Sequence, residues 1–116
     1  YEDSMNKFLR AYLECALWLS AEEEGQPLDD VNSINDISEQ TYSEAEADCA
    51  DFIADNDKDI NGKYSQAGHD FWLTRNHYGA GFWDGNWPKA AGQRMTLASQ
   101  AFGMVDLYEY NGEIYS

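Results

Sequence analysis

The negative charge of this chain is concentrated in its first half. Seventeen of the 22 acidic residues precede Asn61, and only Lys7, Arg10 and Lys58 offset them, so residues 1–60 hold 14 of the 15 net negative charges. A folded chain can place so one-sided a charge only on a surface, and that surface repels nucleic acid, anionic lipid and other acidic proteins. The charge therefore predicts a strongly basic protein partner, and binding to neither nucleic acid nor membranes.

The composition favours a single folded domain over residues 1–116. With 43% hydrophobic and 15% aromatic residues, the chain has enough apolar surface to offset the entropy lost on ordering. No apolar run approaches the roughly 20 residues of a membrane span, and the first residues lack the basic start of a signal peptide, so we expect a cytoplasmic protein. Cys15 and Cys49 lie among apolar residues on separate predicted helices, which favours buried free thiols over a disulfide.

The first half has the periodicity of two helices. Ser4 is placed to cap the first helix, and apolar residues then recur on one helical face until a Glu run and a Gly/Pro loop interrupt them. A second helix is expected over residues 38–57. Asp36 is placed to cap it, with Glu39 three residues later as in a capping box.

The second helix separates its charged and apolar residues almost completely. At 100° per residue with Glu44 at zero, four further carboxylates fall between about −20° and +60°, namely Asp48 (+40°), Asp51 (−20°), Asp55 (+20°) and, if the last turn continues, Asp59 (+60°). Apolar residues occupy an arc from about 80° to 180°, namely Tyr42, Ala45, Cys49, Phe52 and Ile53. The pattern predicts a helix that packs on the first helix and exposes a stripe of five carboxylates.

The acidic stripe has two interpretations. Carboxylates three or four residues apart on a helix are roughly 5–6 Å apart, comparable with the spacing of phosphates along a DNA strand. An ordinary solvated face mixes Lys with Glu, but residues 39–57 contain no basic residue, and their mutual repulsion weakens the helix by about 1 kcal/mol. The stripe is therefore either a solvated face or a surface that imitates a DNA backbone. Five more residues could extend it: Glu22, Glu23, Glu24, Asp29 and Asp30.

The second half predicts short strands and one helix. Residues 70–74 and 82–83 have the composition of strands joined by a Gly-rich turn. A third helix is expected to begin near Pro88 and to end at Gly103, and residues 105–110 and 113–115 flank Asn111-Gly112, a strong signal for a type I′ hairpin. The predicted fold is α+β, with two N-terminal helices packed on a small antiparallel sheet in the order α-α-β-β-α-β-β.

A weak calcium candidate follows the second helix. Oxygen-bearing side chains stand at positions 1, 3, 5 and 9 of an EF-hand-like loop, from Asp57, Asp59, Asn61 and Ser65, with Gly62 at position 6. Position 12 is Gly68 and not the bidentate Glu, so a polar turn is the alternative, and no cofactor other than calcium is expected.

Polar residues also gather around the predicted strands, namely His69, Asp70, Arg75, His77 and Asp84. No nucleophile accompanies them in a known motif, so a structural role is favoured over catalysis and the protein is not expected to be an enzyme. Arg75 and His77 are expected to hydrogen-bond carboxylates or turn carbonyls. The aromatic residues nearby are expected to fill the core, with exposure of some Trp and Tyr as interface anchors as the alternative: Phe71, Trp72, Phe82, Trp83 and Trp87.

Two segments of the second half, AGHDFWLTRN at 67–76 and GAGFWD at 79–84, resemble a family of small acidic proteins encoded by bacteriophages. Residues 12–18, 27–29 and 48–52 are similar to the amino-terminal half of the same family. The chain departs from the family at His77 and Tyr78, where the family has Gly and His. The resemblance implies a viral source and an intracellular setting in a bacterial host. It implies nothing about the activity of the protein.

The leading functional hypothesis is a phage-encoded acidic DNA mimic that binds and inhibits a host DNA-binding protein, such as a restriction enzyme, a CRISPR effector, a uracil-DNA glycosylase or a nuclease. One alternative is a small ligand- or calcium-binding module or enzyme centred on residues 69–84. Another is a virion or replication accessory protein whose acidity only keeps it soluble.

Overall fold

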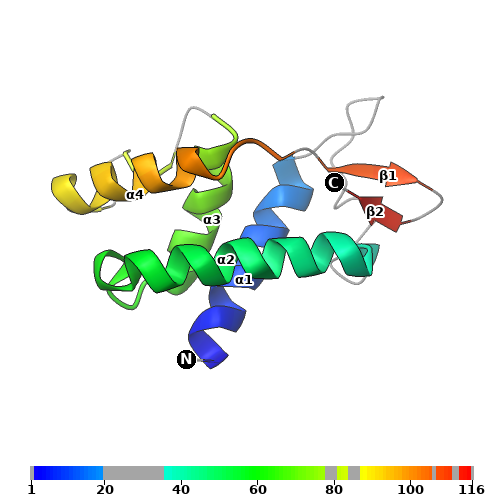
Figure 1. The fold of residues 1–116 in the computed structure, drawn as a ribbon, viewed down its shortest axis with the longest axis horizontal. Coiled ribbons are helices and arrows are strands. Elements are labelled where there is room, and N and C mark those ends of the chain that lie inside the picture. The colour runs from blue at the N-terminus through cyan, green and yellow to red at the C-terminus, as the bar shows by residue number, and fades with distance from the viewer. Residues whose placement is uncertain are drawn as a thin grey trace.

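Helices dominate the part of the chain that the computed structural model describes, which is residues 2–19, 36–77, 81–83, 87–105, 107–110 and 113–115. Four helices and one short hairpin lie within these residues, as Figure 1 shows. Their bounds are α1 Glu2–Leu19, α2 Glu39–Ile60, α3 Tyr64–Arg75, α4 Lys89–Ala101, β1 Tyr108–Tyr110 and β2 Glu113–Tyr115.

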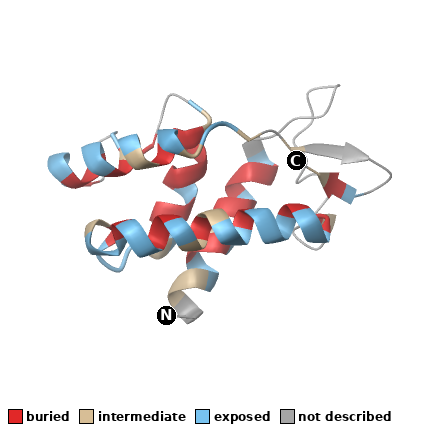
Figure 2. Ribbon diagram, in the orientation of Figure 1, coloured by how far each residue is buried: buried red, intermediate tan, exposed pale blue. Residues whose placement is uncertain are grey.

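The helices pack in two layers. α1 and α3 make the most extensive contact of any two elements, and α2 crosses in front of α1 with α4 beside it (Figure 1). The backbones of α1 and α3 are in direct contact at Gly68. A Cβ atom on Gly68 of α3 would lie 2.1 Å from the Phe8 carbonyl oxygen of α1. Figure 2 shows that α2 alternates buried and exposed residues along its length.

Stacked aromatic rings from three helices and a turn form the centre of the core. Phe52 of α2 lies 4.4 Å from Phe71 of α3 and 5.7 Å from Phe82, measured between ring centroids. Phe8 of α1 contacts both Phe52 and Phe71, at 5.7 and 5.8 Å. Aromatic pairs of this kind each contribute about 0.5–1.5 kcal/mol beyond the area that they bury. This cluster orients α2 with its charged side toward solvent.

The predicted α+β fold is wrong, because the described residues form a mostly helical protein. Residues 70–74 lie in α3 and not in a strand, and Phe82 and Trp83 lie in a turn. Eight of the twelve residues of α3 are buried. A short helix buried on most sides shows an almost continuous apolar run, and periodicity cannot separate such a run from a buried strand.

The helix ends differ from the predicted ones by a few residues. α1 begins at Glu2, so Ser4 lies inside the helix and does not cap it. The N-cap of α2 is Ser38 and not Asp36, because the Ser38 hydroxyl accepts a hydrogen bond from the Thr41 amide at 3.1 Å. α2 continues to Ile60, so Asp59 is part of the helix.

The C-terminal hairpin lies where the sequence predicts one. β1 pairs with β2 in antiparallel register, with Glu109 opposite Ile114, while residues 111 and 112, which are predicted to form the turn, lie outside the described residues. The Ser38 amide donates to the Ile114 carbonyl at 2.8 Å, which attaches the hairpin to the start of α2.

Two further predictions can be compared with the structure. Cys15 and Cys49 are both buried free thiols, as predicted. Within the described ranges, no helix combines the length and the apolar character needed to cross a bilayer.

Candidate functional site

Three of the five predicted stripe carboxylates are fully available on the outer side of α2. Glu44, Asp51 and Asp55 are exposed, and no salt bridge joins them to a Lys or Arg among the residues that the structure describes. Glu44 accepts a hydrogen bond from the Gln40 side chain at 3.2 Å. Their position follows from the amphipathic pattern, because the opposite side of α2 is held in the core by buried residues such as Phe52 and Ile53.

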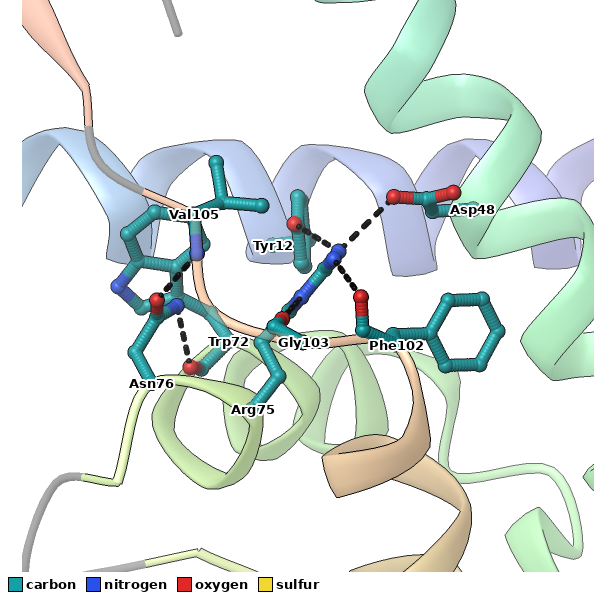
Figure 3. A network of polar contacts seen from close by, with 8 residues as sticks. All are labelled: Tyr12, Asp48, Trp72, Arg75, Asn76, Phe102, Gly103 and Val105. Atoms are coloured by element: carbon teal, nitrogen blue, oxygen red, sulfur yellow. Dashed lines mark hydrogen bonds and ion pairs between the residues drawn. The ribbon is translucent and has the colours of Figure 1, made fainter.

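Asp48 has a structural partner that the sequence did not indicate. Its Oδ2 accepts a hydrogen bond from Arg75 Nη1 at 3.0 Å, and its side chain is 35% exposed. The Arg75 guanidinium also donates to the Tyr12 hydroxyl at 2.9 Å (Figure 3). Burial is the largest influence on Tyr12 and raises the pKa of its hydroxyl far above the ordinary value. Asp48 is therefore half-buried and paired, unlike Glu44 and Asp51, the stripe carboxylates on either side of it.

Arg75 joins four segments of the chain through its one side chain. Besides Tyr12 of α1 and Asp48 of α2, it donates to the carbonyl oxygens of Phe102 at 3.1 Å and Gly103 at 2.8 Å, just after α4 (Figure 3). Arg75 is only 2% exposed. The prediction that it hydrogen-bonds a carboxylate and turn carbonyls is confirmed.

Asp59 is paired at the far end of the stripe. Arg94 of α4 donates to both carboxylate oxygens, from Nε at 2.9 Å and from Nη2 at 2.6 Å. These hydrogen bonds hold the pKa of Asp59 below its usual value, and the same hydrogen bonds raise the pKa of Arg94. The pair links the end of α2 to α4.

The two paired carboxylates are those closest to the apolar face of α2. Asp48 and Asp59 lie at about +40° and +60° on the helical wheel, where the side chains lean toward α3 and α4, whereas the other three lie between about −20° and +20°. Arg75 and Arg94 therefore offset part of the repulsion that the sequence alone attributes to the stripe.

Sequence reasoning missed three more exposed carboxylates on α2, Glu39, Glu46 and Asp57. They lie at about −140° to −160° on the same wheel, so the pattern that located the stripe could have found them. The Tyr64 hydroxyl donates to Asp57, which raises the pKa of Tyr64. We call the three exposed stripe carboxylates Glu44, Asp51 and Asp55 the outer acidic face; with Glu39, Glu46 and Asp57 they make six exposed carboxylates on this helix. Lys58 is the only basic residue in α2.

The proposed extension of the stripe cannot be placed. Glu22, Glu23, Glu24, Asp29 and Asp30 lie outside the described residues, and their contribution stays a prediction.

The four calcium candidates occupy a helix junction and not an EF-hand loop. Asp57 and Asp59 belong to the last turns of α2, Asn61 caps it with φ 52°, and Ser65 lies in α3. The carboxylates turn to different partners, Asp57 to Tyr64 and Asp59 to Arg94. Nowhere in the described part of the chain do three or more His, Cys, Asp or Glu side chains gather so that they could hold a metal ion. Calcium binding stays a prediction.

The polar residues between 69 and 84 are placed on different sides of α3. Asp70 is buried and accepts a hydrogen bond from Trp87 Nε1 at 2.7 Å, and His69 Nδ1 lies 3.5 Å from Asp70 Oδ1. Arg75 points instead toward Asp48, as described above. His77 is exposed with φ 59°, and Asp84 lies outside the described residues.

Four of the five aromatic residues expected in the core are buried, and Trp83 is not. Phe71, Trp72, Phe82 and Trp87 are at most 6% exposed, whereas Trp83 is 46% exposed.

Comparisons with protein-family models, with curated proteins and with solved structures gave no match.

Proposed function

We propose that this protein binds the basic surface of a partner through the outer acidic face of α2, and that it does so in place of nucleic acid. The observation that carries the proposal is the charge of α2, whose outward side holds that face. Six exposed carboxylates and a single Lys occupy one 22-residue helix of a chain with net charge −15. A surface of one sign attracts a partner of the other sign and speeds their encounter.

The rigidity of α2 supports the proposal. Glu44 and Asp55 are eleven residues apart, which corresponds to roughly 16 Å along the helix axis, or about half a turn of B-DNA. The helix that carries them is fixed from behind by the aromatic core and at its sides by Arg75 and Arg94. Charges held in one geometry lose little entropy on binding, which favours affinity for a preformed Lys/Arg surface.

Inhibition of a host DNA-binding protein is the specific form of this proposal. It draws on the resemblance to acidic phage proteins, since a viral protein gains from blocking restriction, CRISPR or nuclease activity. A partner surface built to neutralise phosphates would accept carboxylates at comparable intervals, and its binding would weaken as salt rises.

The experiment compares two triple variants with the same change in charge. One neutralises the outer acidic face (Glu44→Gln, Asp51→Asn, Asp55→Asn), and the control neutralises exposed carboxylates elsewhere (Glu14→Gln, Glu46→Gln, Glu113→Gln). Wild-type protein is immobilised, basic proteins are captured from a bacterial lysate at low salt, and the affinity of each captured protein for the variants is then measured with and without duplex DNA.

We expect the first triple variant to bind about 30-fold more weakly than wild type, because three charge contacts of about 0.7 kcal/mol each are lost. The control should lose much less, and DNA should displace the partner. Equal losses in the two variants, or a captured partner that keeps its DNA while bound, would show that the outer acidic face does not replace nucleic acid.

A further inference from the structure

An open groove runs between α1 and α3, away from the outer acidic face. Its volume is about 540 Å³, and the described residues that line it include Glu14, Cys15 and Trp18 of α1 and Ser65, Gln66 and His69 of α3. This volume lies within the range of small-molecule sites in proteins. None of these described lining residues is Lys or Arg, so the positive charge beside the groove comes from Arg10, which pairs with Glu14.

Two acceptors stand on opposite sides of the groove. The Glu14 side chain is 59% exposed and holds an ion pair with Arg10, whose own side chain is 77% exposed. A ligand can share or displace so exposed a pair at little cost, because a carboxylate accepts several hydrogen bonds. On α3, His69 Nδ1 lies 3.5 Å from Asp70 Oδ1, and the neutral tautomer that donates from Nδ1 to this carboxylate has Nε2 as an acceptor.

Trp18 supplies an aromatic surface beside these acceptors. Its side chain is 57% exposed, although α1 buries most of its other large apolar residues. The face of an indole ring attracts cations. A guanidinium group fits this combination better than an ammonium, because it is planar, stacks on aromatic rings, is weakly hydrated and binds carboxylates through two parallel hydrogen bonds.

We propose that the groove between α1 and α3 binds a guanidinium group carried on a short alkyl stem, with the guanidinium against Trp18 and Glu14. The strongly negative net charge of the chain raises the local concentration of such cations. The ligand is either a free alkylguanidine or the side chain of an arginine in another protein, and both present the same chemistry. This site does not depend on binding by the outer acidic face.

The test is a titration of the full chain followed by 1H–15N NMR. The probes are butylguanidinium, its neutral isostere butylurea, and a blocked Gly-Arg-Gly peptide. We expect butylguanidinium to shift the Trp18 indole and the backbone amides of Gln66 and His69 saturably, with a Kd on the order of 1 mM. Butylurea should shift none of them saturably. A peptide that binds at least as well identifies a protein-borne arginine as the ligand, and binding of the free probe alone identifies a small molecule.

Variants with matched controls distinguish binding in the groove from a general attraction of cations by the negative charge of the protein. Glu14→Gln should weaken butylguanidinium binding about 5-fold, while Glu46→Gln, the same change on α2, should leave it unaltered. Trp18→Ala should weaken binding by a similar factor of about 5, and Trp83→Ala, which removes another exposed Trp, should not. Glu14 is exposed, so its variant tests the site even if Trp18→Ala fails to fold. Saturable binding of butylurea, or equal effects of Glu14→Gln and Glu46→Gln, would overturn the proposal.

Discussion

Replacement of Arg75 by Met should destabilise the protein by about 3 kcal/mol. The variant keeps an apolar stem but loses donors to four acceptors: the Tyr12 hydroxyl, one Asp48 oxygen and the carbonyls of Phe102 and Gly103. Leaving the buried Tyr12 hydroxyl with fewer partners costs about 1–2 kcal/mol. Asp48 is 35% exposed and can be hydrated, so its lost pair costs less than the 3–5 kcal/mol typical of a fully buried one.

Two ring contacts add to this cost. The Arg75 guanidinium lies 5.4 Å from the Phe71 ring centroid and 5.5 Å from that of Phe102, and each contact contributes about 0.5 kcal/mol. Arg75→Lys should lose about 2 kcal/mol, because an ammonium keeps the charge near Asp48 but cannot reach all four acceptors from one planar fork.

Urea denaturation of wild type and of the two variants measures these differences. The slope of the free energy of unfolding against urea concentration is expected to be the same in all three proteins. Arg10→Met is the control, since it removes an exposed pair with Glu14 and should change the free energy of unfolding by less than about 0.5 kcal/mol. If Arg75→Met costs no more than the control, Arg75 does not join the four segments energetically and our account of the network is wrong.

Two further predictions concern the contact between α1 and α3 and the buried thiols. Gly68→Ala should lower the free energy of unfolding by about 3 kcal/mol, because the new Cβ would lie 2.1 Å from the Phe8 carbonyl oxygen and force the helices apart. Gly62→Ala, which has open space but φ +83°, should cost only about 1 kcal/mol, and equal losses in urea denaturation would contradict the close approach. Burial raises the pKa of Cys15 from 9.0 to about 12, so above about pH 9 only the unfolded chain releases this proton. Stability should then fall by about 1.4 kcal/mol per pH unit up to about pH 12, and Cys15→Ala should remove that share of the slope. An unchanged slope in the variant, measured by urea denaturation between pH 8 and pH 10.5 under reducing conditions, would show that Cys15 does not titrate in this way.

The second helix was predictable because the order of polar and apolar residues within its own segment is enough to identify it. One side of α2 faces solvent and the other faces the core, so the period of its residues separates Glu44, Asp51 and Asp55 from Phe52 and Ile53. Within the stripe, Asp48 and Asp59 have the wheel angles nearest the apolar arc, but nothing in the sequence shows that they are paired or names their partners.

The third helix was not predictable in this way. α3 is buried by α1 on one side and by α2, α4 and the turn at Phe82 on others, so the residues from Asp70 to Arg75 are all buried and have no polar side to reveal a period. The apolar run Phe71-Trp72-Leu73 has the composition of a strand, and only packing against the α1 backbone at Gly68 shows why a helix is needed there.

The sequence by itself determined that the first half contains two helices, that one side of α2 carries exposed carboxylates and that both cysteines are buried, because each of these follows from local periodicity and composition. Tertiary structure decided which charges remain free. Arg75 reaches Asp48 across 27 residues of sequence and Tyr12 across 63, and Arg94 reaches Asp59 across 35. Such pairs depend on how the helices cross. The periodicity of a helix shows which of its faces is apolar, but not which neighbouring helix packs against that face.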